Sequence, residues 1–269
     1  MHRSAWVSAA SAVTGAALIV GGLAGTGHAA VRTGDLRTAT LFSLIPRQPD
    51  AFSGKNVVVR WAPCITQNGT TKTHVIHYRV NPAGKSSRVK LAKRAVKRLS
   101  AASGLMFAYD GKTSYIPHNK LVNGQLFFQA LDEENKAHVP LVIAWAKAGT
   151  GTGASNLLDG GEAGKGTVSW RSGSTSELRI NDGAVVVRRN AGSMLKSGFG
   201  AGGTVGSLVL HELGHAVGLE HADPGEIMAP IIDSRTPGNY ATGDRKGLAR
   251  VGLPAGCMTT PRLPAVNSF

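Results

Sequence analysis

The sequence predicts an α+β domain built on a mixed β-sheet. Three observations support this fold class: alternating apolar residues over 74–80, an amphipathic basic segment over 85–100 and a continuous apolar run over 141–146. Alternation is typical of a half-buried strand, a stripe with a period of about 3.6 residues is typical of a helix, and a short continuous apolar run is typical of a strand buried on both faces. The order strand, helix, strand and strand therefore predicts a mixed sheet.

The first residues are typical of a secretory signal. Arg3 supplies the positive end, an apolar stretch rich in Ala, Val and Leu continues to Leu23, and small residues precede Ala30. We predict export with cleavage after Ala29, and hence a secreted, extracellular protein. A membrane anchor is the alternative, but the apolar run is short and no second hydrophobic segment of about 20 residues follows it.

The remaining chain is long enough for one domain with its own core. Residues 1–29 are the predicted signal peptide. Residues 30–55 contain two prolines and few periodic apolar positions, which indicates an irregular arm or a short removable pro-segment. The folded domain is expected over residues 56–258, followed by a C-terminal tail at 259–269.

Strands are expected at 57–61, 74–80 and 105–109, and the helix at 85–100 carries much of the positive charge. The chain has 30 Lys and Arg residues against 16 Asp and Glu, a net charge of +14. We interpret the basic helix face as solvated, with association with anionic cell-wall polymers as the alternative. Nucleic-acid binding is not expected, because no aromatic residues are interleaved with these charges.

The segment 149–166 is rich in glycine and is expected to be a long flexible surface loop. Asp159 and Glu162 are its only acidic residues, which leaves a Ca²⁺ site there as an open alternative. An edge strand is expected at 167–170. An Asn-Asp-Gly triplet is expected to form a turn inside the segment 177–187.

The main candidate site is a segment with the sequence HELGHAVGLEH. His211 and His215 are four residues apart, so they project from one face of a helix and can share a metal ion. Glu212 lies on the flank of that face, where it can act on a water without being a ligand. His221 can join the site only if the helix ends before it. Gly218 supplies that ending, because glycine adopts the left-handed conformation at little cost.

These three imidazoles predict one catalytic Zn²⁺. Three neutral nitrogens leave one tetrahedral position open, which is typical of catalytic rather than structural zinc. Thr204 is the expected N-cap of the helix. An apolar spine opposite the histidines is formed by Val205, Val209, Leu213 and Val217.

The histidine segment resembles the motif of the metzincin zinc metallopeptidases, and the EIMAP sequence at 226–230 resembles their Met-turn. Among metzincins the chain is most similar to the matrixins, specifically the short, secreted bacterial matrixin-like proteins. Weaker likenesses are WAPC at 61–64, the apolar strand at 141–146 and TGDRKGL at 242–248. The resemblance covers residues 57–257.

This resemblance implies a twisted, mostly parallel sheet with an active-site helix above a cleft, and a small C-terminal lobe with the Met-turn and a last helix. It implies a zinc metalloendopeptidase in which zinc activates a water and a glutamate takes its proton before the attack on a peptide carbonyl. The implied roles are zinc ligands for His211, His215 and His221, general base for Glu212, and a structural floor for Met228. Residues 233–241 would border the S1′ pocket, with Tyr240 as a wall residue.

The implied partners are protein or peptide substrates, and we expect a monomer with no bound nucleic acid and no stable membrane insertion. Two alternatives stay open. One is an envelope-associated protein that binds anionic wall polymers and has a vestigial zinc site, and the other is an amidase that acts on wall peptides.

Cys64 and Cys257 are the only cysteines. In an exported protein two cysteines are expected to pair, and this disulfide would tie the first strand region to the C-terminus. The alternative is that Cys64 ligates the zinc and keeps the enzyme latent.

Overall fold

The structure is a computed structural model of the chain. It describes residues 26–29, 58–67, 69–122, 125–129, 131–132, 137–158, 161–172 and 177–259. Most of the predicted signal peptide, the predicted arm at 30–55, Asp159 and nearly all of the predicted tail lie outside the described residues.

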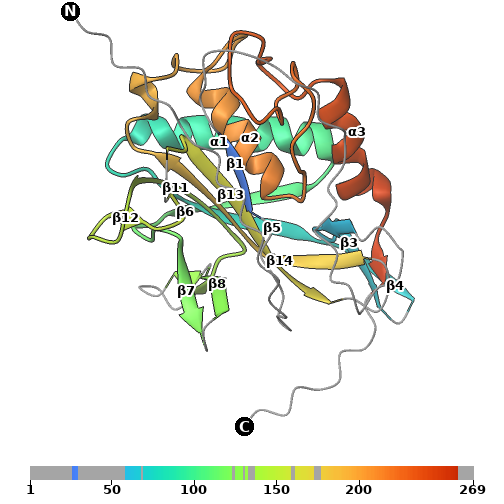
Figure 1. The fold of residues 1–269 in the computed structure, drawn as a ribbon. Helices are drawn as coiled ribbons and strands as arrows, with labels where there is room; N and C mark the ends of the chain where they lie inside the picture. The colour runs from blue at the N-terminus through green and yellow to red at the C-terminus, as the bar shows by residue number, and fades with distance from the viewer. Residues whose placement is uncertain are drawn as a thin grey trace, which may run out of the picture.

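The domain is built on a sheet with the strand order β1-β13-β14-β11-β5-β6, in which β2 also pairs with β14 and β12 with β11 (Figure 1). These strands are β1 (Thr26–Ala29), β2 (Val58–Arg60), β5 (Val75–Asn81), β6 (Met106–Lys112), β11 (Leu141–Ala148), β12 (Ala154–Ser155), β13 (Gly164–Ser172) and β14 (Glu177–Arg188). The neighbours β14, β11, β5 and β6 are parallel, whereas β13 is antiparallel to β14. The predicted mixed, mostly parallel sheet is confirmed.

Two helices, α1 (Ser86–Ser103) and α2 (Val205–His215), cover one face of this sheet, and α3 (Thr242–Val251) packs beside them (Figure 1). Two short 3-10 helices are η1 (Ala191–Ser193) and η2 (Leu253–Ala255). The main core lies between the helices and the sheet and includes Ile76, Leu99, Ile143 and Leu213. None of the helices in the described part of the chain combines the length and the apolar character that crossing a membrane requires.

Strand β11 is buried on both faces, as its continuous apolar sequence predicts. Leu141 and Ile143 pack into the main core beneath the helices. Val142 and Ala144 face the other way and are fully buried in a second cluster with Val139. Burial on both sides requires apolar residues at every position, which explains the absence of alternation.

Several short strands were not expected from the sequence. They are β3 (Cys64–Gln67), β4 (Thr70–Thr73), β7 (His118–Val122), β8 (Gln125–Gln129), β9 (Leu131–Asp132), β10 (Ala137–His138) and β15 (Met258–Thr259). They form a three-stranded sheet β15-β3-β4 and the pairs β7-β8 and β10-β9. Their pairing is antiparallel except for β15 and β3, which are parallel.

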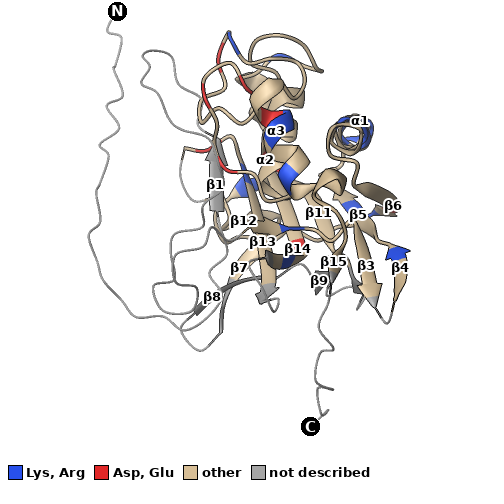
Figure 2. Cartoon of the chain, turned by 90° about the vertical axis from the view of Figure 1, so that its right-hand side faces the viewer, with Lys and Arg blue, Asp and Glu red and all other residues tan. Residues whose placement is uncertain are grey.

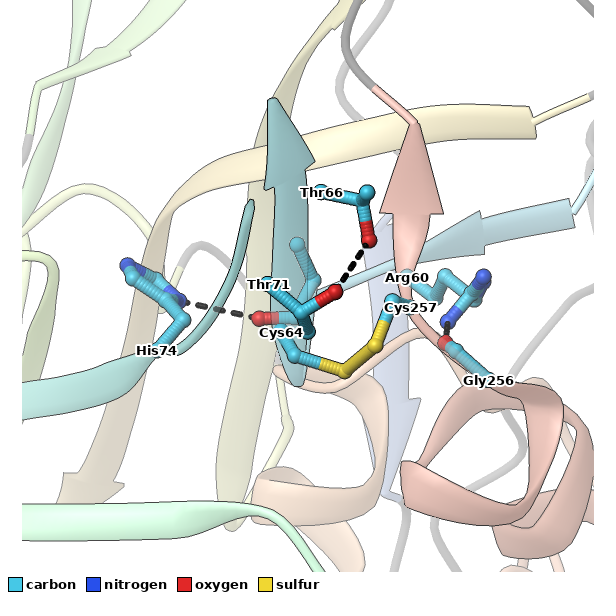
Figure 3. The surroundings of a disulfide bond; sticks show 8 residues. Arg60, Cys64, Thr66, Thr71, His74, Gly256 and Cys257 are labelled. Carbon is cyan, nitrogen blue, oxygen red and sulfur yellow. Dashed lines mark hydrogen bonds between the residues drawn. A yellow bond between two sulfur atoms is a disulfide. The ribbon is translucent and has the colours of Figure 1, made fainter. Parts of the chain in front are cut away.

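Cys64 and Cys257 form a disulfide that links β3 to the residues just before β15 (Figure 3). Next to it, the Nη1 atom of Arg60 donates a hydrogen bond of 2.8 Å to the carbonyl oxygen of Gly256. In the chain-entropy model, a cross-link that closes a loop of this length stabilises the folded state by about 5 kcal/mol. The Cys64 sulfur is bonded to another sulfur, so the structure does not support the alternative of a zinc-ligating thiol.

The predicted turn at 181–183 is wrong, because β14 runs through it without a break. The register with β13 shifts between Ser169 and Trp170, and Asn181 is the extra residue, which makes this point a β-bulge. Asp182 and Gly183 pair with β13, and Gly183 also pairs with Leu141 of β11, so the ladders override the local preference of the Asn-Asp-Gly triplet for a turn.

The expectation of a long flexible loop at 149–166 is also wrong in part. Leu157 and Leu158 are fully buried against the sheet, and β12 pairs with the end of β11. Strand β13 begins at Gly164, earlier than expected, and β1 pairs with it on its outer side. β1 falls inside the predicted signal peptide, whose cleavage after Ala29 stays a prediction.

Candidate metal centre

Helix α2 begins at a defined cap. The Thr204 hydroxyl accepts a 3.0 Å hydrogen bond from the Ser207 amide, and the Ser207 hydroxyl accepts one of 3.0 Å from the Thr204 amide. This reciprocal pair is a capping box, which satisfies two backbone donors at the start of the helix. Thr204 is the N-cap that the sequence predicts.

The helix ends at His215, and the chain turns sharply at Gly218, whose φ is 101°. A Cβ atom on Gly218 would lie 2.1 Å from the carbonyl oxygen of Val59. The Trp61 indole nitrogen donates a 2.9 Å hydrogen bond to the carbonyl oxygen of Ala216 in the same turn. Backbone conformation and close packing therefore both require glycine at position 218.

The turn brings His221 to the two helix histidines. One ring nitrogen from each of His211, His215 and His221 lies within 4.8 Å of the others. The Nε2 atoms of His211 and His215 are 3.0 Å apart. Two nitrogens bound to one tetrahedral Zn²⁺ at the usual bond length are about 3.3 Å apart, so the spacing suits this ion. The three histidines are positioned to bind a metal.

Backbone carbonyl groups orient two of these rings. The Nδ1 atom of His211 bonds to the carbonyl oxygen of Ile227 at 2.8 Å, and the Nδ1 atom of His215 bonds to that of Leu219 at 2.8 Å. A carbonyl oxygen only accepts, so each Nδ1 carries the proton and each Nε2 offers a lone pair. Burial lowers the pKa of His211 to about 3, which keeps its imidazole neutral.

Glu212 follows His211 directly in the sequence, and its side chain is fully buried. Within the described residues no side chain bonds to its carboxylate, and the Gly166 amide lies close enough to stabilise the charged form. Burial raises the pKa of Glu212 well above its ordinary value of 4.5. A buried carboxylate to which no side chain bonds fits a site in which a divalent cation supplies the opposite charge and a water supplies a proton.

The strand β13 passes directly over this carboxylate. A Cβ atom on Gly164 would lie 2.8 Å from the Oε1 atom of Glu212, and one on Gly166 would lie 2.2 Å from the Glu212 carbonyl oxygen. The two glycines therefore let the β13 backbone approach α2 closely. These glycines lie in the segment expected to be a flexible loop, and this contact was not expected from the sequence.

Met228 is completely buried beneath α2, and its backbone is held by α3. The Asp244 carboxylate accepts hydrogen bonds from the Ile227 amide at 2.8 Å and from the Met228 amide at 3.0 Å. It also accepts one of 2.8 Å from the amide of Ala241, the N-cap of α3. This role of Asp244 was not expected from the sequence, although an acidic residue in the first turn of a helix is a recognisable capping signal.

Tyr240, for which the resemblance implies a wall role in the S1′ pocket, is buried against α2. Only 1% of its surface is exposed, and its hydroxyl donates a 2.7 Å hydrogen bond to the carbonyl oxygen of Leu210. Burial raises the pKa of Tyr240 well above 10, so the phenol keeps its proton. The residue ties the segment 233–241 to α2.

The family model for matrixin matches residues 71–251, which is more than half of the chain. The chain belongs to the matrixin family. Membership supports a zinc-dependent metallopeptidase that acts on protein or peptide substrates, and it confirms the resemblance seen in the histidine segment. The comparison with curated proteins finds no match. In this matrixin, one ring nitrogen from each of the three histidines of the motif lies within 4.8 Å of the others.

Proposed function

We propose that this matrixin is a secreted endopeptidase in which His211, His215 and His221 hold one catalytic zinc ion and Glu212 is the general base. The fully buried carboxylate of Glu212, to which no described side chain bonds, is the observation that carries the proposal. Holding a metal requires only the three histidines, so a vestigial metal site would have no need of this costly group. The envelope-binding alternative is therefore less well supported.

The side chains divide the chemistry among them. Bound zinc lowers the pKa of a coordinated water toward about 7 and polarises a carbonyl oxygen. Glu212 takes the proton from the attacking water and returns it to the leaving amine, so that one carboxylate serves first as base and then as acid. The carbonyl groups of Ile227 and Leu219 keep two histidine rings in the tautomer that this role requires.

An extended substrate would pair with β13, because main-chain hydrogen bonds hold a peptide without reading its sequence. The chain places its own β1 there, with Thr26 opposite Thr167 and Ala29 opposite Gly164. All the β1 residues precede the predicted cleavage point after Ala29. Removal of the signal peptide would therefore free this edge of β13 for a substrate.

The deciding experiment uses the exported protein and its Glu212→Gln and Glu212→Ala variants. Bound zinc is measured by atomic absorption, and hydrolysis is measured on casein, a peptide library and wall peptides. We expect all three proteins to retain zinc, and the variants to lose at least about 100-fold in rate. Asp110→Asn removes an exposed carboxylate and is the matched control.

Two results would contradict the proposal. A native protein that retains zinc but cleaves no peptide is not an endopeptidase. If Glu212→Gln is as active as the native protein, Glu212 is not the base. Cleavage confined to wall peptides would favour the amidase alternative.

A further inference from the structure

Basic side chains on α1 turn toward the protein rather than only toward solvent. Figure 2 shows Lys and Arg residues gathered on this helix. The cation lies over an aromatic ring in four cases: Arg88 over Trp145 at 5.7 Å, Lys93 over Tyr109 at 4.6 Å, Arg94 over Phe199 at 4.9 Å and Arg98 over Phe199 at 4.5 Å. The sequence interpretation of a fully solvated basic face is therefore incomplete.

Arg98 has a second partner in a distant segment. Its Nη1 atom donates a 2.8 Å hydrogen bond to the carbonyl oxygen of Gly238. The guanidinium group is planar, so it can stack on the ring of Phe199 while its edge donates to a carbonyl group. Arg94 shares the ring of Phe199, but the hydrogen bond to Gly238 comes from Arg98.

Phe199 is fixed against the helix that carries the histidines. A Cβ atom on Gly206, in the first turn of α2, would lie 2.6 Å from the Cδ1 atom of Phe199. The Gly206 amide also donates a 2.8 Å hydrogen bond to the carbonyl oxygen of Gly198. Arg98 therefore links α1 to a ring that rests on α2.

The segment 233–241 joins the Met-turn to α3 and has little regular structure. We call it the specificity loop because the family resemblance implies that it borders the S1′ pocket. The carbonyl oxygen of Thr236 accepts a 2.8 Å hydrogen bond from the Gly202 amide. Tyr240 is held to α2 through Leu210. Between these two points, Arg98 holds the carbonyl of Gly238.

Gly238 is also held by close packing. A Cβ atom on this residue would lie 3.0 Å from the backbone of Gly200. The middle of the specificity loop therefore lies against the segment that precedes α2, and the hydrogen bond from Arg98 fixes it there. Loss of this bond would leave a partly buried carbonyl group without its charged donor and free the loop to shift.

We propose that Arg98 is a positioning residue that sets the conformation of the specificity loop, and through it the selection of the substrate side chain next to the scissile bond. The selectivity part rests on the proposed endopeptidase function. Arg98 contacts neither the histidines nor Glu212 in any hydrogen bond or ring contact described for it. Its loss should change which peptides are cut and leave metal binding intact.

The first test measures the loop without any assay of activity. Amide hydrogen exchange is followed in the zinc-loaded native protein and in the Arg98→Ala, Arg98→Lys and Arg94→Ala variants. A charged hydrogen bond is lost in Arg98→Ala, so we expect exchange over residues 236–240 to rise by about tenfold or more. Arg94→Ala removes the other cation over Phe199. Its exchange rate over residues 236–240 should stay within about twofold of that of the native protein.

The second test uses two peptide series that differ only in the residue after the scissile bond, one with small and one with large side chains. We expect the ratio of the two kcat/KM values to change by about tenfold in Arg98→Ala, mainly through KM, with bound zinc unchanged. Arg98→Lys should recover part of the native ratio, because an ammonium group can donate to Gly238 but cannot stack as a plane.

Each result decides the proposal. Equal loop exchange in Arg98→Ala and Arg94→Ala overturns the positioning role. A loosened loop with an unchanged selectivity ratio overturns the specificity role. If the native protein cleaves no peptide, the endopeptidase function fails, and the exchange measurement still decides whether Arg98 positions the loop.

Discussion

Met228 lies directly against Gly214 of α2, so closely that a Cβ atom on the glycine would stand 2.2 Å from the methionine sulfur. Gly214 belongs to the turn of helix between the two histidines of α2, and Met228 follows Ile227, whose carbonyl orients His211. The contact thus joins the two segments that build the metal centre.

We predict that Gly214→Ala destabilises the protein although alanine favours helix. The methyl group would force the buried Met228 sulfur to move, and overpacking of this kind costs about 1–3 kcal/mol, against a gain of about 1 kcal/mol in helix propensity. Displacement of Met228 should also weaken zinc binding. Thermal unfolding and zinc titration check this. Gly192→Ala, where a Cβ atom meets nothing within 4 Å, is the control and should be neutral.

Removal of the metal should lower the stability of the native protein reversibly. A ligand present at about 1,000 times its dissociation constant stabilises the folded state by about 4 kcal/mol, which corresponds to about 10 °C in Tm for a domain of this size. Calorimetry with a chelator, and then with zinc restored, measures the shift. The His215→Ala variant lacks one of the three histidines, so its Tm should be nearly the same with zinc and with the chelator. A similar zinc-dependent shift in that variant would mean that the metal binds elsewhere.

Asp244→Ala should destabilise the C-terminal lobe. Two buried backbone amides and one partly buried amide lose their acceptor. Each unsatisfied buried donor costs about 1–3 kcal/mol, so a loss of at least about 2 kcal/mol in the free energy of unfolding is expected. Asp244→Asn keeps one acceptor oxygen and should lose less. Urea unfolding of both variants provides the measurement, with Asp110→Asn as the exposed control. Equal stability of Asp244→Ala and the native protein would refute the capping role.

The burial of His74 predicts that the stability of the protein depends on pH. Its Nδ1 atom bonds to the carbonyl oxygen of Ala62 at 3.0 Å (Figure 3), and burial lowers its pKa below the ordinary value of 6.5. Below pH 6.5 the unfolded chain therefore binds a proton more readily than the folded chain does. The contribution of His74 to stability is present above pH 6.5 and is lost as the pH falls below it.

The test compares urea unfolding of zinc-loaded native protein and His74→Gln between pH 8 and pH 5, about the range in which an ordinary histidine titrates. Glutamine can still donate to the carbonyl of Ala62 but does not titrate. The native protein should lose more stability than the variant as the pH falls. Parallel curves would show that His74 makes no contribution.

The metal-binding segment was predictable because its geometry is local. The helical spacing of His211 and His215 and the glycine at 218 set the positions of the side chains with no knowledge of the rest of the fold. The capping signal of Thr204 is local in the same sense. The order β5, α1, β6 and β11 likewise followed from periodicity, which reports the burial of each segment.

The supports of the site could not be predicted in this way. The carbonyls of Ile227 and Leu219 orient the histidines, but a backbone group has no residue signature. The bond from Arg98 to Gly238 joins residues that are 140 positions apart. The bulge at Asn181 belongs to the pairing of β14 with β13, which is known only when the sheet is assembled.

The packing of Val59 against Gly218 defines how much of the chain a working metal centre needs. The region that matches the family begins at residue 71, after β2 and Trp61. A shortened protein that starts there would lack both the carbonyl that closes over Gly218 and the indole that holds the Ala216 carbonyl. The turn that places His221 beside the other two histidines would lose the backbone and the side chain that pack against it. We therefore expect the minimal metal-binding unit of this matrixin to extend upstream and include β2.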